Sequence, residues 1–164
     1  MNQLDIVKKL HKWMTEFVEV PNDKLGNWPP CPYARQARIN NNIGIKFCEV
    51  FEFDDVIRES LQTLEEKEVV VICFNHNAID PDSLQKFVRD KNELLMPINY
   101  VILEDHPDAV EHINGVCMNF GECGLLVIQK LDKLNNASEQ LKSKGYYDVW
   151  TKSDLDDVVT WRYK

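Results

Sequence analysis

The sequence predicts an α+β fold, a ferredoxin-like split β-α-β sandwich with one extra helix and an N-terminal helical arm. From residue 43 onward, stretches rich in β-branched residues alternate with stretches of helical periodicity. Their order is strand, helix, strand, helix, strand, strand, helix, strand, which matches the sandwich when the second helix is set aside. A flavodoxin-like parallel α/β sheet is the alternative, because consecutive strand-to-helix steps also satisfy the rule of right-handed crossovers.

We expect a single domain over residues 1–164, because a chain of this length with 44% hydrophobic residues can bury one sizeable core. An N-terminal helix and a Cys-Pro loop occupy residues 1–42. The α/β core occupies residues 43–150, and a C-terminal helical turn occupies residues 151–164. No internal repeat or low-complexity tract divides the chain further.

The N-terminal helix is predicted over residues 4–20, where apolar side chains recur at intervals of three and four residues. These side chains are Ile6, Leu10, Trp13, Met14, Phe17 and Val18. Pro21 ends the helix, and a turn-rich loop follows. A second, short helix can begin at Pro32, since proline suits the first helical position.

The core alternates between strands and helices. Strands are predicted over residues 43–51, 68–74, 98–104, 124–131 and, as a short fifth strand, 146–150. The run of β-branched residues in 68–74 is typical of a strand that is buried on both faces. Helices are predicted over residues 54–67, 80–95 and 132–145. Asp80 is the predicted cap of the second of these helices, and Gly145 ends the third.

Composition excludes several classes of partner. The net charge of -8 and the isoelectric point near 5.0 repel phosphate backbones, so we expect no nucleic-acid binding. No apolar run approaches the roughly 20 residues that span a bilayer, so we expect a cytoplasmic protein that does not bind membranes. Five cysteines without a secretory signal favour reduced thiols. The acidic runs at residues 63–68 and 153–157 are interpreted as solvated faces.

Cys31 lies in the proline-rich stretch GNWPPCPYARQARI. If Pro32 opens a helix, the sulfur faces free N–H groups and the positive end of that helix, which favours the thiolate. Arg35 and Arg38 add positive charge near the sulfur or near a bound anion. The alternative is a loop clamp, in which rigid side chains hold the loop on the core and Cys31 only fills space. The clamping residues are then Trp28, Pro29, Pro30 and Tyr33.

His106 is the candidate partner of Cys31. It follows a predicted strand, and ligand sites of α/β proteins commonly lie at the carboxyl ends of strands. A carboxylate such as Asp108 would orient the imidazole and raise its pKa, as in nucleophilic catalysis. The alternative is that His106 and its acidic neighbours only cap a short helix.

The sequence gives little support to a bound metal or nucleotide. His106, His112, Cys117 and Cys123 share one irregular segment, but their spacing does not fit a zinc knuckle. The glycines of this region match neither the dinucleotide-binding nor the Walker pattern. The residues therefore identify no metal site and no cofactor.

Three segments resemble the domain of unknown function 1415 family. The matching residues are Trp13 in the N-terminal helix, then Cys31, Pro32, Tyr33 and Ala34, and then His106, Pro107 and Asp108. Their order and approximate separation agree over the first two-thirds of the chain. Tyr33 replaces the phenylalanine of the family, and the segment after Asp108 differs. The resemblance implies no activity, and it marks the Cys-Pro and His-Pro-Asp segments as those that define the family.

Three functions follow from these observations. The first is an enzyme with Cys31 as nucleophile or redox centre, His106 as acid or base, and Asp108 as the group that orients it. Its contacts with a small anionic substrate are assigned to Arg35, Arg38, Tyr33 and Trp28. The second is a non-catalytic module that binds a ligand or a protein. The third is a metal-dependent enzyme that uses His106 and its acidic neighbours.

Overall fold

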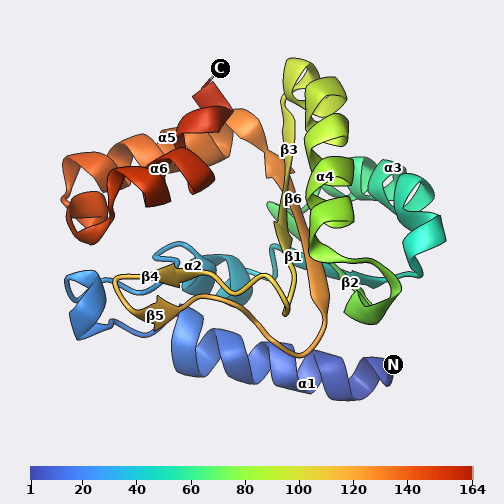
Figure 1. The fold of residues 1–164 in the computed structure, drawn as a ribbon, viewed down its shortest axis with the longest axis horizontal. Helices are drawn as coiled ribbons and strands as arrows, with labels where there is room; N and C mark the ends of the chain where they lie inside the picture. The colour runs from blue at the N-terminus through green and yellow to red at the C-terminus, as the bar shows by residue number, and fades with distance from the viewer. Residues whose placement is uncertain (164) are drawn as a thin grey trace.

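The computed structural model describes residues 1–163 and is built on a four-stranded mixed sheet (Figure 1). The strand order is β1 (Ile43–Phe47), β2 (Val69–Phe74), β6 (Gly124–Lys130) and β3 (Tyr100–Asp105). β1 and β2 are parallel, and β6 lies antiparallel between β2 and β3. β1 and β3 are therefore the two edge strands of this sheet.

Two helices cover one face of the sheet. α3 (Phe53–Thr63) connects β1 to β2, and α4 (Pro81–Leu95) connects β2 to β3. Both connections advance in the same direction across the sheet, so right-handed crossovers place both helices on one face. Their apolar stripes pack on the sheet residues of that face. Members of this core are Phe53, Val56, Ile57, Leu84, Val88, Ile72, Phe74, Ile102, Leu126 and Ile128.

The N-terminal helix covers the opposite face. α1 (Gln3–Trp13) packs Ile6 and Leu10 against Cys73 and Leu125 of the sheet. It continues into a π-helical segment, Met14–Val18. The predicted helix over residues 4–20 therefore forms in two parts, and the sheet is enclosed between α1 and the α3/α4 pair.

The remaining elements lie beside this three-layered core (Figure 1). A short helix, α2 (Ala34–Ile39), precedes β1, and a two-stranded hairpin joins β4 (His112–Ile113) to β5 (Val116–Cys117). The C-terminal part contains α5 (Leu131–Ser143) and α6 (Lys152–Val158). Short 3-10 segments cover Asp23–Leu25, Val50–Glu52, His76–Ala78, Met96–Ile98, Tyr146–Val149 and Thr160–Tyr163. None of the helices within residues 1–163 has both the length and the apolar character needed to cross a bilayer.

The structure confirms the mixed α+β class but not the complete ferredoxin-like topology. β2, α4 and β3 form a split β-α-β unit with β6 inserted between the two strands. The first β-α-β unit is not split, because β1 lies directly beside β2. The flavodoxin-like alternative is wrong, since β6 is antiparallel to both of its neighbours.

The predicted fifth strand over residues 146–150 is also wrong. Tyr146–Val149 form a 3-10 turn that follows Gly145 in the left-handed region, at φ 87°. The aromatic rings of this segment pack against one another, with 5.0 Å between the ring centroids of Tyr147 and Trp150. Such local ring packing replaces the pairing with a neighbouring strand that an extended conformation would require. By contrast, the capped helix at residues 80–95 is confirmed, with Asp80 Oδ1 accepting a hydrogen bond from the N–H of Ser83.

Candidate functional site

Cys31 lies in a turn that precedes α2. The carbonyl oxygen of Cys31 accepts a hydrogen bond from the N–H of Ala34, and the helix begins only at Ala34. The prediction that Pro32 is the first helical residue is therefore wrong. Cys31 is exposed, and desolvation of its thiol by neighbouring protein atoms raises the pKa of the thiol. The N–H groups of Tyr33 and Ala34 oppose that rise without cancelling it. The helix end therefore does not produce the lowered thiol pKa that the sequence suggested.

His106 is a buried histidine whose ring is held by backbone groups. Its Nε2 lies 2.7 Å from the carbonyl oxygen of Ile79 and 3.1 Å from that of His76. Its Nδ1 accepts a hydrogen bond from the N–H of Asp108 at 3.1 Å. Both ring nitrogens are therefore occupied, and within residues 1–163 no hydrogen bond joins His106 to Cys31. The predicted Cys31, His106 and Asp108 set does not form a hydrogen-bonded triad, since Asp108 contacts the ring through its backbone.

Arg38 is not free to bind an anionic substrate. Its Nε and Nη2 donate to both carboxylate oxygens of Glu19, at 2.7 and 2.8 Å. The side chain of Glu19 is only 5% exposed, so this two-point pair anchors α2 to the end of the N-terminal helical segment. Arg35 is exposed, and it has no ion-pair partner within residues 1–163.

The aromatic residues of the Cys31 loop contact the C-terminal part of the chain. Trp28 packs edge-on against Tyr146, with ring centroids 5.8 Å apart. The hydroxyl of Tyr146 donates to the carbonyl of Pro30, and the hydroxyl of Tyr33 donates to Gln140 Oε1. These contacts favour the loop-clamp interpretation over substrate binding by Trp28 and Tyr33.

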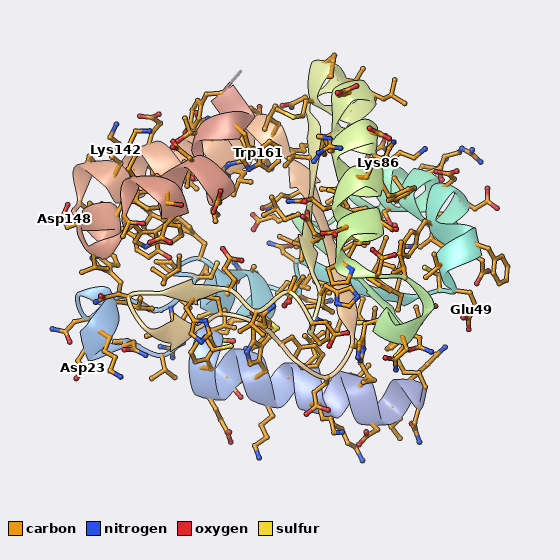
Figure 2. The ribbon with its side chains drawn as sticks, viewed as in Figure 1. Asp23, Glu49, Lys86, Lys142, Asp148 and Trp161 are labelled. Atoms are coloured by element: carbon orange, nitrogen blue, oxygen red, sulfur yellow. The ribbon has the colours of Figure 1, made fainter. Side chains whose placement is uncertain are left out.

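A large cleft lies elsewhere, between α4, β3 and the C-terminal helices. We call it the α4/α6 cleft; its volume is about 1010 Å³. One face of α4 from Gln85 onward, with Met96 just after its end, forms the first wall, and Leu103 and Glu104 of β3 contribute to the floor. Asp157 and Trp161 belong to the opposite wall. Figure 2 shows Trp161 on the C-terminal segment, beside β3. A cleft of this size with mixed apolar and polar walls is typical of a ligand-binding site.

Carboxylates converge on this cleft. Burial among protein atoms raises the pKa of Glu104, and the nearby charges of Glu111 and Asp105 raise it further. Burial raises the pKa of Glu111 in the same way, followed by repulsion from acidic neighbours that include Asp157. Neither carboxylate forms an ion pair within residues 1–163. The cleft therefore holds clustered negative charge that no bonded cation compensates.

The hydrogen-bonding groups of the cleft floor are already occupied. The side-chain amide of Asn92 bonds to both the N–H and the C=O of Ile102 on β3. The edge strand thus presents side chains to the cleft, while the backbone N–H and C=O of Ile102 already have partners.

The walls of the cleft also contain apolar surface. Met96 and Pro97, in the 3-10 segment that follows α4, line the same space as Val158 and Trp161 of the C-terminal segment. The indole Nε1 of Trp161 donates to the carbonyl of Asp157 at 3.0 Å, which fixes the ring against this wall. The cleft therefore combines negative charge with an apolar, partly aromatic surface.

Sequence reasoning did not find this site. Ser153, Asp156 and Asp157 are exposed, in agreement with the predicted solvated face, but the sequence pattern does not reveal that Asp157 also lines a cleft. In the sequence, Glu104 ends a predicted strand and Glu111 lies in the irregular segment that follows. This short separation along the chain is the only sequence feature that indicates that the two carboxylates are close in space. No group of three or more His, Cys, Asp or Glu side chains within residues 1–163 is arranged to hold a metal ion.

Comparisons of this chain with protein-family models, with curated proteins and with solved structures give no match. The resemblance to the domain of unknown function 1415 family therefore stays a prediction that rests on three short segments. The geometry of the chain itself has to carry any functional argument.

Proposed function

We propose that this chain is a non-catalytic binding module whose ligand occupies the α4/α6 cleft. The ligand class that fits is an organic cation with an apolar body. Glu104 and Glu111 carry this proposal, because two carboxylates with raised pKa values face a cleft of about 1010 Å³ without a bonded cation. A cation placed between them would reduce their mutual repulsion.

The apolar walls of the cleft support the assignment of an apolar body to the ligand. Trp161 offers an aromatic surface, and cations bind favourably over such rings. The nucleophilic enzyme receives less support, since both nitrogens of His106 are engaged by backbone groups. Five free thiols support a reducing compartment such as the cytoplasm as the site of action.

The test is a comparison of two small probes that differ in charge. Saturation-transfer difference NMR is recorded with 2-phenylethylammonium and with the uncharged 2-phenylethanol. We expect binding of the amine and at least ten-fold weaker binding of the alcohol, because only the amine can pair with the carboxylates.

A matched pair of variants locates the binding. The double variant E104Q/E111Q removes the two charges of the cleft and should abolish the signal from the amine. The variant E65Q/E66Q removes two exposed charges after α3 and should leave that signal unchanged. Equal binding of amine and alcohol, or equal losses in the two variants, would contradict the proposal.

A further inference from the structure

We propose that the natural occupant of the α4/α6 cleft is a basic amphipathic α-helix of a partner protein. This inference rests on the proposed function and specifies the ligand. Three observations support it: the length of the cleft, the occupied backbone groups on the edge of β3, and the negative charge of the cleft walls.

The length of the cleft suits a helical segment. The lining residues recur at helical intervals along α4, from Gln85 through Arg89 and Asn92, and continue to Met96 just after its end. At a rise of about 1.5 Å per residue, this wall is about 16 Å long, which is three helical turns. A ligand that contacts the whole wall therefore has the dimensions of a short helix packed beside α4.

The β3 edge disfavours an extended peptide. A strand that binds a sheet edge needs free N–H and C=O groups on that edge. Asn92 already occupies both groups of Ile102, near the middle of β3. A helix has no such requirement, because its own backbone bonds are internal and only its side chains contact the partner.

Charge and apolar surface specify the helix. Glu93, Glu104, Glu111 and Asp157 face the cleft against one arginine, Arg89, which leaves the cleft negative. The apolar side chains of both walls require an apolar stripe on the same ligand. A helix with lysine or arginine beside its apolar stripe satisfies both conditions, as in other grooves that bind amphipathic helices.

Two labelled 14-residue peptides of the same leucine and lysine composition test this assignment by fluorescence anisotropy. One has helical periodicity and the other alternates leucine with lysine, the pattern of a strand. We expect the helical peptide to bind at least ten-fold more tightly than the alternating one. E104Q/E111Q should weaken its binding about ten-fold, and E65Q/E66Q, which changes the net charge equally, should not. The circular dichroism of the peptide should show added helix on binding.

The outcomes separate the two proposals. Equal or tighter binding of the alternating peptide, or an equal effect of the two double variants, would overturn the helix assignment. If 2-phenylethylammonium binds in the cleft and the helical peptide does not, the occupant assigned here is wrong and the proposed function stands. If neither probe binds, both proposals fail.

Discussion

The side chain of Asn92 forms two hydrogen bonds with the backbone of Ile102, so that one α4 amide occupies the middle of the β3 edge. Its Nδ2 donates to the carbonyl at 2.9 Å, and its Oδ1 accepts from the N–H at 2.8 Å. Asn92 is only 5% exposed. An unpaired edge strand is a site of aggregation, and this amide blocks the edge where the cleft would otherwise expose it.

Replacement of Asn92 should therefore be strongly destabilising. Asn92→Leu keeps a similar volume but leaves the N–H and C=O of Ile102 without partners in a buried position. We expect the free energy of unfolding to fall by about 2–5 kcal/mol, measured by urea denaturation. Asn92→Asp should also destabilise, because its carboxylate can accept from the N–H of Ile102 but cannot donate to the carbonyl of that residue. A loss below about 0.5 kcal/mol in Asn92→Leu would show that the amide is dispensable.

The pair of Arg38 and Glu19 predicts a coupled stability effect. Arg38→Leu leaves the nearly buried Glu19 carboxylate without its two donors, and we expect the free energy of unfolding to fall. Glu19→Leu combined with Arg38→Leu should cost less than the sum of the two single changes. A double-mutant cycle by chemical denaturation measures this coupling. Additive effects would mean that the pair contributes nothing as a unit.

Removing the charge of Glu104, by the substitution Glu104→Gln, should stabilise the folded protein. Its folded-state pKa lies above the ordinary value of 4.5, so the folded state favours the protonated form. Stability is therefore lost as the pH rises from about 4.5 through the raised pKa. Because part of the Glu104 side chain is still exposed to solvent, which screens the effect of desolvation, Glu104→Gln should stabilise by only about 0.5 kcal/mol at pH 7.

Thermal unfolding measures this effect. The midpoint should rise by about 1–2 °C at pH 7 and should not change at pH 3.5, where the carboxyl is protonated in both states. A lower midpoint at pH 7 would contradict the raised pKa. A higher midpoint in Glu104→Gln would be typical of the loss of a ligand-binding residue, because such residues commonly reduce stability in exchange for function.

The cysteines predict an order of alkylation that tests the Cys31 environment. Cys117 is exposed and should react first with iodoacetamide at pH 8. Burial raises the pKa of Cys48 from 9.0 to about 11, so at pH 8 its thiolate fraction should be about 100-fold lower than that of a thiol with a pKa of 9.0. Burial also raises the pKa of Cys31, and we expect it to react more slowly than Cys117. Mass spectrometry of timed samples gives the order, and fastest labelling at Cys31 would restore the reactive-cysteine hypothesis.

The sequence predicted those parts of the fold that local chemistry determines. The cap at Asp80 and the β-branched run of β2 gave a helix and a strand that the structure confirms. The segment at residues 146–150 looked equally strand-like, but its tyrosines pack against Trp28 and Trp150 instead. Such tertiary contacts override propensity, and no pattern within the segment itself reveals them.

The site was less predictable than the fold. Cys31 is predicted at the start of a helix and His106 at the end of a strand, yet backbone groups such as those of Val18 and Ile79 hold these two residues in place. The cleft depends on three segments that are distant in sequence, α4, β3 and the C-terminal helices. Its acidic character emerges only when Glu104, Glu111 and Asp157 come together in space. Single-segment motifs cannot report such a juxtaposition.

The most direct test of the central claim is amide chemical-shift mapping with 2-phenylethylammonium on the isotope-labelled protein. If the α4/α6 cleft is the binding site, shifts should concentrate in residues 85–96, 103–111 and 157–161, and they should disappear in E104Q/E111Q. Shifts centred on the Cys31 loop or on α1 would contradict binding in the cleft. The same holds if 2-phenylethylammonium, like 2-phenylethanol, causes no chemical-shift changes.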